Sequence, residues 1–270
     1  MEYITKDSEP ENVVSILGEF GVALIKNFIP KKKVIELLEE SSNATSNYRN
    51  YKNPFGDCAR FSLNPISENL SISRDLEKGK NLKVLPEEFH GTRSLFNLPF
   101  FKEIILSYLG NNAGFMEVVV FTKDHIPDKN TVYGLLHFDR RHQLKFMIYL
   151  NDVSKENGAF CCIPKSHIVG KELYYKGWAK TLKVESNNES SIDSLAINTS
   201  EDSPTYKLIP CVYEGQTKLK HIDLINDRKY IEGKAGDLVI FDTHLLHLGG
   251  FVANGKERLT LKGHTFAYVE

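Results

Sequence analysis

The sequence is poor in several features that would place a protein in a class at first sight. No apolar run among its 270 residues approaches the roughly 20 residues that a membrane-spanning helix needs. The charged start, Met1 to Asp7, contains no apolar signal segment. The formal net charge is -1, so no excess of one sign points to nucleic acid or to a membrane surface as a partner. We therefore expect a soluble, cytoplasmic protein.

Cysteine is also scarce, with four residues and no CxxC pair. Cys161 and Cys162 are adjacent, which is poor geometry for a disulfide between them. We therefore expect reduced, partly buried thiols in a reducing compartment.

Aromatic residues, by contrast, are plentiful, with 16 Phe and 12 Tyr in a chain that is 41% hydrophobic. This is ample for the core of one large domain spanning residues 1–270, and many of these residues favour strands. In the N-terminal part, apolar spacing predicts helices at residues 12–20, 31–42 and 87–109, a short buried strand at 22–25, and a loop at 43–64.

From residue 115 onward, apolar and β-branched runs replace the helical spacing. The expected strands cover residues 115–122, 131–137, 144–150, 159–163, 238–242 and 258–268. Helices first and strands later predict an α+β fold, in which a helical layer packs against a β core. The stretch 184–205 is rich in Ser, Asn, Glu and Asp, so we expect a flexible insertion or lid around residues 171–230.

A possible metal site begins at a predicted strand end with His137-Phe138-Asp139. Side chains at i and i+2 of a strand point the same way, so His137 and Asp139 can converge on one ion. A second histidine from a distant strand would complete a two-histidine, one-carboxylate site with open positions on iron(II). The spacing alone is weak, because His221 and Asp223 repeat it.

A second segment carries the remaining groups. The Gly236-Asp237 turn leads into an apolar strand that is followed by His244 and His247. Arg258 lies on the next predicted strand, and its fork suits the distal carboxylate of a dicarboxylate cosubstrate.

These segments together resemble the phytanoyl-CoA dioxygenase-like branch of the 2-oxoglutarate oxygenases. The resemblance rests on HFD at 137–139, KFMIYLNDVSKENGAFCCIPKSH at 145–167, GDLVIFDTHLLHLGG at 236–250 and ER at 257–258. One departure is Lys165, which stands where the family usually has glycine, and we expect it to alter a turn.

The resemblance implies a distorted double-stranded β-helix, a jelly-roll or cupin-like core, with flanking N-terminal helices. It also implies iron(II) and the cosubstrate 2-oxoglutarate. The family pattern places the metal ligands on His137, Asp139 and His247, in preference to His244, and the cosubstrate arginine on Arg258.

Three further residues are candidates for cosubstrate binding. Lys145 lies on the strand after the His-x-Asp segment, where it is either a carboxylate ligand or a lysine at a strand end that reaches solvent. Thr260 shares the strand face of Arg258, and Thr243 lies close to the histidines, although a strand threonine often has no ligand role.

The resemblance predicts an enzyme that oxidises a small-molecule substrate with O2, most simply by hydroxylation, releasing succinate and CO2. In related halogenases a small residue replaces the carboxylate, so the presence of Asp139 favours hydroxylation or another oxidation over halogenation. The alternatives are a divalent-metal hydrolase on a similar barrel and a non-catalytic β-barrel binding module. A hydrolase would have no need of Arg258, and the intact ligand set argues against a binding module.

Overall fold

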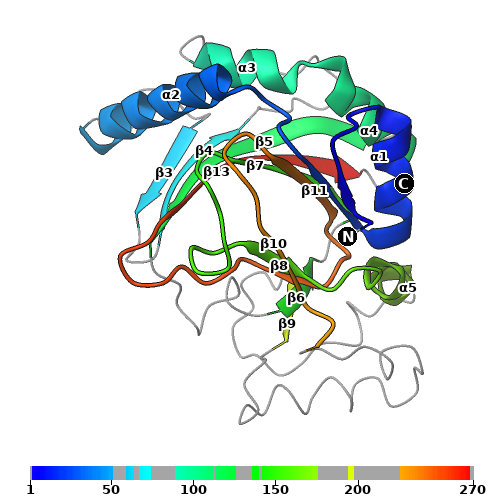
Figure 1. The fold of residues 1–270 in the computed structure, drawn as a ribbon. Helices are drawn as coiled ribbons and strands as arrows, with labels where there is room; N and C mark the ends of the chain where they lie inside the picture. Colours follow the sequence, from blue (N-terminus) through cyan, green and yellow to red (C-terminus); the bar gives the residue numbers. More distant parts are fainter. Residues whose placement is uncertain are drawn as a thin grey trace.

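The computed structural model describes residues 2–50, 59–63, 67–73, 89–111, 113–125, 136–139, 142–175, 194–197 and 226–267. Within these ranges the chain forms two β-sheets that face each other, with helices on the outer side of the larger sheet (Figure 1). This confirms the predicted mixed α+β architecture.

Proline and glycine mark the helix ends. Pro10 and Pro99 stand at the first positions of two helices, where the fixed φ of proline suits the first turn and its missing N–H is not needed. The first helix ends at Gly21, whose φ of 73° is left-handed. No helix in the described ranges is long and apolar enough to cross a membrane. The helices are α1 (Pro10–Phe20), α2 (Lys31–Asn50), α3 (His90–Phe96), α4 (Pro99–Leu109) and α5 (His167–Tyr175).

The larger sheet has eight strands, and its neighbours are antiparallel except for the first pair in its order, which is parallel. Its order is β1 (Ile4–Thr5), β2 (Val22–Ile25), β11 (Leu238–Asp242), β7 (Leu144–Tyr149), β13 (Arg258–Ala267), β5 (Ala113–Asp124), β4 (Ser67–Ser73) and β3 (Ala59–Leu63).

The smaller sheet has five antiparallel strands and lies below the larger one in Figure 1. Helices α1 to α4 cover the opposite face of the larger sheet. The order of the smaller sheet is β10 (Lys229–Ile231), β8 (Phe160–Cys162), β12 (His247–Leu248), β6 (Leu136–Asp139) and β9 (Ser194–Ile197).

Strand β7 separates the two cores of the protein, because its side chains alternate between the two faces of the sheet. Phe146 and Ile148 pack on the helix side with the residues of α1, α2 and α4. Met147 and Tyr149 pack on the other side, against residues of the smaller sheet. Tyr149 donates a hydrogen bond of 2.6 Å from its hydroxyl to the carbonyl of Ile231, which ties the sheets together.

The predicted elements match most of the structure, and the misses have local causes. Residues 43–64, expected to be a loop, extend α2 to Asn50 and form β3 at Ala59–Leu63. The polar residues of these segments hide them from a hydrophobic-period argument. The single helix expected at 87–109 is divided into α3 and α4 next to Pro99, since proline removes a helical N–H.

Much of the expected lid lies outside the described residues, namely 176–193 and 198–225. The decoy pair His221 and Asp223 falls in that part as well. Within the same region the structure describes α5, β9 and the start of β10.

The departure from the family at Lys165 lies at a position of left-handed backbone. Lys165 has a φ of 71°, a conformation that favours glycine. Its backbone N–H donates to the carbonyl of Phe20 at 2.8 Å, and its ammonium lies 4.7 Å from the Phe20 ring centroid. Lys165 thus contacts the end of α1 from a position where the family usually has glycine.

The Gly236 turn is expected to be intolerant of a side chain. Gly236 has a φ of 96°, and a Cβ there would lie 2.5 Å from the carbonyl oxygen of Ile29. We expect Gly236→Ala to lower the free energy of unfolding by about 2–4 kcal/mol, because strain and displaced backbone both contribute. Gly255, with a φ of 75° and open space around it, is the matched control. Its alanine variant should lose clearly less in urea unfolding, and equal losses would contradict the steric argument.

Candidate metal centre and cosubstrate pocket

The structure brings the three predicted metal ligands together on the smaller sheet. His137 and Asp139 lie two residues apart on β6, and His247 on β12 pairs directly with His137. Directly opposed residues of an antiparallel pair share a face, as do residues i and i+2. Each of the three offers a ligand atom within 4.8 Å of the other two.

The spacing of the donor atoms suits a single ion. His137 Nε2 lies 3.4 Å and His247 Nε2 3.9 Å from Asp139 Oδ1. Metal–nitrogen and metal–oxygen bonds are about 2.0–2.2 Å long, so donors around one ion lie within about 4.4 Å of each other. The site is closed to most solvent, since His137 is 7% and His247 4% exposed.

Asp139 is held in its charged form. Burial works to raise the pKa of this carboxyl, but the Lys145 ammonium and a hydrogen bond from His137 keep it well below its usual value. Lys145 Nζ lies 2.5 Å from Asp139 Oδ2, which leaves Oδ1 facing the histidines. Lys145 thus contacts a candidate metal ligand, and its expected contact with the cosubstrate stays a prediction.

His247 has the tautomer that a metal needs. Its Nδ1 donates a 2.7 Å hydrogen bond to the carbonyl of Leu245, so Nε2 carries the lone pair. Burial, followed by the nearby His137, lowers the pKa of His247 to about 3. The ring is therefore neutral at pH 7 and able to bind a cation.

Arg258 lies at the start of β13, the strand on which the sequence predicts it, but it already holds a carboxylate. Its Nε and Nη2 donate to Asp124 Oδ2 at 2.9 and 2.7 Å, and its Nη1 donates to the carbonyl of Gly158. Burial opposes the charge of Asp124, yet Arg258 and then Lys262 lower the pKa of Asp124 below its usual value. The sequence argument did not find this Asp124 partner.

Buried polar atoms without hydrogen-bond partners lie on the strands next to this pair. Thr260 on β13 lies opposite Thr122 on β5 and Tyr149 on β7. Within the described part of the chain, the hydroxyls of Thr122 and Thr260 and the Nε2 of His264 are buried without a hydrogen bond. Such groups normally have a partner. The residues present therefore fit a polar molecule bound between the sheets, as 2-oxoglutarate would be.

Thr243 is placed differently. Its buried hydroxyl accepts a 2.8 Å hydrogen bond from the backbone N–H of Gln143 and lies 3.2 Å from the carbonyl of the same residue. It thereby secures the start of β7, and its expected role with the cosubstrate stays a prediction.

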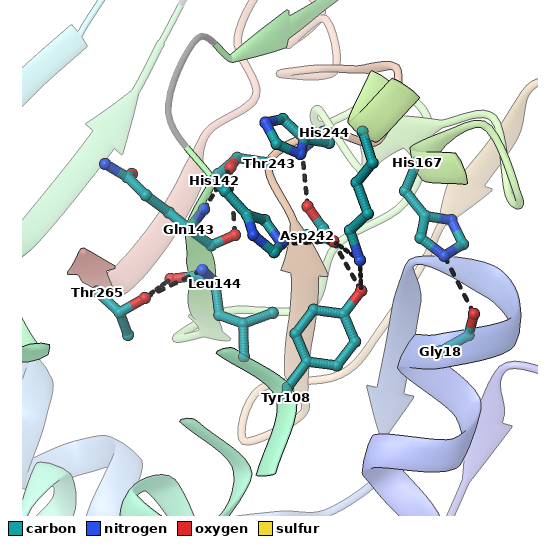
Figure 2. Close-up of polar contacts among 11 residues, drawn as sticks. Gly18, Tyr108, His142, Gln143, Leu144, His167, Asp242, Thr243, His244 and Thr265 are labelled. Carbon is teal, nitrogen blue, oxygen red and sulfur yellow. Dashed lines mark hydrogen bonds and ion pairs between the residues drawn. The ribbon is translucent and has the colours of Figure 1, made fainter. Parts of the chain in front are cut away.

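A second group of potential ligands lies nearby, formed by His142, Asp242 and His244 (Figure 2). The two histidine rings stack with centroids 4.7 Å apart. The fully buried carboxylate of Asp242 accepts hydrogen bonds from Tyr108 at 2.7 Å and from the backbone N–H of His244 at 2.8 Å.

The charge of this group is already balanced. Lys171 Nζ lies 2.9 Å from Asp242 Oδ2 and donates to the hydroxyl of Tyr108 at 3.0 Å, while His142 Nε2 lies 3.1 Å from the same Oδ2. The Lys171 ammonium therefore already supplies a positive charge next to the Asp242 carboxylate. We therefore interpret the Asp242 cluster as a structural connection between α4, α5 and β11, and His247 rather than His244 as the ligand on this segment.

The partners of Asp242 were beyond sequence reasoning. Tyr108 and Lys171 lie on separate helices far from Asp242 in the chain, and only an unusual charged residue at the end of an apolar strand signalled a buried carboxylate.

Comparisons with known proteins cover the segments that hold this site. Residues 128–260 match the family model described as phytanoyl-CoA dioxygenase (PhyH), a range that includes the triad and Arg258. No curated protein matches the chain.

Several solved structures share the fold at low sequence identity. The epimerase SnoN, solved with Fe3+, alpha ketoglutarate and nogalamycin RO, gives a TM-score of 0.54 at 12% identity, covering 95% of this chain and 83% of SnoN. The alpha ketoglutarate-dependent carbocyclase SnoK from nogalamycin biosynthesis gives 0.53 at 14%, covering 94% and 82%. HygX from Streptomyces hygroscopicus, with nickel and 2-oxoglutarate bound, gives 0.52 at 12%, covering 94% and 85%.

The fold, the triad and the family match define an enzyme of the 2-oxoglutarate-dependent class, with iron(II) and 2-oxoglutarate as cofactors. Within that class, residues 128–260 match the phytanoyl-CoA dioxygenase (PhyH) family model, the family that the sequence motifs resemble.

Proposed function

We propose that the protein is an iron(II)- and 2-oxoglutarate-dependent dioxygenase that hydroxylates a small molecule and releases succinate and CO2. The observation that carries the proposal is the buried set of His137, Asp139 and His247, whose donor atoms lie within 4.8 Å of one another beside a strip of unpartnered polar groups.

The strand order supports a double-stranded β-helix as the core. From β5 to β8, successive strands alternate between the larger and the smaller sheet, and from β10 to β13 they alternate again. Successive strands in these two segments therefore belong to opposite sheets, which is the arrangement of a jelly-roll. The triad and Arg258 would face the inside of such a barrel.

The chain's own residues would hold the metal and orient the cosubstrate. His137 and His247 would each supply an imidazole nitrogen and Asp139 a carboxylate oxygen to the ion, a donor set that suits iron(II). When bound, iron supplies the activation of O2 that no side chain can provide. Lys145 would hold the second oxygen of Asp139, which leaves Oδ1 for the ion.

Arg258 would hold the distal carboxylate of 2-oxoglutarate from the floor of the pocket, with Thr260 as a hydroxyl donor. Thr243 would support cosubstrate binding indirectly, because its hydrogen bond to Gln143 fixes the start of β7. The bound cosubstrate and the closely packed residues around it, such as Phe241, would keep water from the reacting atoms.

The intact carboxylate at Asp139 argues against halogenation, and hydroxylation of a small molecule is the oxidation that we propose. SnoN and HygX were solved with nogalamycin RO and hygromycin B, respectively. We therefore propose that the substrate is also a small organic molecule, admitted at the open side of the metal.

Two measurements test the proposed function. Mn(II)-loaded protein should bind 2-oxoglutarate in calorimetry, and protein without metal should bind it far more weakly. With iron(II), O2 and 2-oxoglutarate, the protein should form succinate, and a His137→Ala variant should not. The absence of metal-dependent 2-oxoglutarate binding in the wild type would refute the proposal.

A further inference from the structure

The inner face of β13 presents four polar side chains in a row. Arg258, Thr260, Lys262 and His264 occupy alternate positions of the strand, and alternate positions share a face. The strand pairs with β5 on one side and with β7 on the other, which places Lys145 opposite His264. The row thus runs from the Arg258 end of the pocket to the level of Lys145, which contacts the metal ligand Asp139.

This face of the larger sheet carries three cationic side chains, Lys145 on β7 and Arg258 and Lys262 on β13. Two of them have a carboxylate partner. Lys145 is bound to Asp139 at 2.5 Å, and Arg258 is bound to Asp124 through two of its nitrogens. Because Asp124 offsets the charge of Arg258, this arginine alone leaves an incoming carboxylate poorly neutralised.

Lys262 is the exception. Among the described residues, its ammonium makes no hydrogen bond and no ion pair, although Asp124 and Arg258 are close enough to affect its charge. Burial lowers the pKa of Lys262 to about 8, so the group stays mostly charged at pH 7. The residue is only partly exposed, and an ammonium that is partly removed from water without a carboxylate partner favours an incoming anion.

We propose that Lys262 is a second carboxylate-binding residue of the pocket and holds the distal carboxylate of 2-oxoglutarate together with the hydroxyls of Thr122 and Thr260. This inference rests on the proposed function. The chelating end of the cosubstrate is neutralised by the metal, so the distal end needs a cation inside the barrel. Lys262 lies between Arg258 and Lys145 along the row and has its charge available.

A purely structural role for Lys262 fits the contacts less well. Such a role would make it the counterion of Asp124, but Asp124 Oδ2 already accepts two hydrogen bonds from Arg258. The unpartnered hydroxyls of Thr122 and Thr260 would also stay unexplained, whereas a bound carboxylate accepts from hydroxyls and ammonium alike.

The test compares 2-oxoglutarate with pyruvate, which has the same chelating end but no second carboxylate. Binding of both to Mn(II)-loaded protein is measured by calorimetry for the wild type, Lys262→Met and Lys262→Gln. Both variants should bind 2-oxoglutarate about 10- to 100-fold more weakly, because a charge-assisted contact is lost. Pyruvate affinity should stay within about twofold, since pyruvate does not reach this residue.

Lys123→Met is the matched control, because Lys123 lies on β5 with a 42% exposed side chain paired to Glu257. It should bind both acids as the wild type does. Unchanged 2-oxoglutarate affinity in the Lys262 variants, or an equal loss for both acids, would overturn the inference while the proposed function stands. A wild type that binds neither acid would overturn both. Two substitutions of different polarity guard against a variant that does not fold.

Discussion

Replacing His247 by alanine is expected to lower the affinity for a divalent metal by more than about 100-fold, which exceeds the loss typical of a residue that only supports a ligand. The reason is the geometry of its Nε2, which carries a lone pair at pH 7 and lies 3.9 Å from Asp139 Oδ1. Because the variant does not retain the metal, its formation of succinate from 2-oxoglutarate should fall to background. Titration with Mn(II) and a succinate assay with iron(II) measure the two effects.

His244→Ala is the control for this experiment. His244 is also a buried histidine, three positions earlier, but it stacks on His142 and belongs to the Asp242 cluster. Its loss should weaken packing and leave Mn(II) affinity within a few-fold of wild type. If His244→Ala lost the metal while His247→Ala kept it, the ligand assignment would be wrong.

Asp242→Ala is expected to cost about 3–5 kcal/mol in free energy of unfolding, the range for breaking a buried charge pair. The carboxylate is fully buried, and its removal leaves Lys171, Tyr108 and a backbone N–H without their acceptor. Urea unfolding at pH 7 measures the loss. Asp152→Ala should cost far less, because Asp152 and its partner Lys234 are 63% and 73% exposed.

The same carboxylate predicts a pH dependence. Burial works to raise the pKa of Asp242, but the hydrogen bond and charge of His142, followed by Lys171, hold it far below its usual value. A lowered pKa in the folded state stabilises the protein above the unfolded pKa of about 3.9. This stabilisation declines as the pH falls below that value. The stability difference between wild type and Asp242→Ala should therefore narrow in acid, and a constant difference would argue against an ionised Asp242.

Several parts of the fold follow from local sequence patterns. Helical spacing located α1 and the first part of α2, and short apolar runs located β2, β7, β8 and β11, because side-chain period and burial depend on nearby residues. The strand Ser67–Ser73 escaped the argument, since its alternating polar residues do not stand out from a loop.

The family motifs drew attention to His137, Asp139, His247 and Arg258, and the structure places the first three together. The motifs could not predict which residues these side chains contact. Asp124 lies 134 positions before Arg258 and Tyr108 lies 134 before Asp242, yet each pair is in hydrogen-bond contact.

The sequence by itself located α1, β2, β7, β8 and β11, the strand face shared by His137 and Asp139, and the glycine turn before β11. Only the tertiary structure decided that β12 lies beside β6, that Lys171 balances Asp242, and that Lys262 has no ion-pair partner among the described residues. The division has a physical reason. Periodicity and turn geometry depend on neighbours in the chain, whereas charge pairing and desolvation depend on which distant strands the packed core brings together.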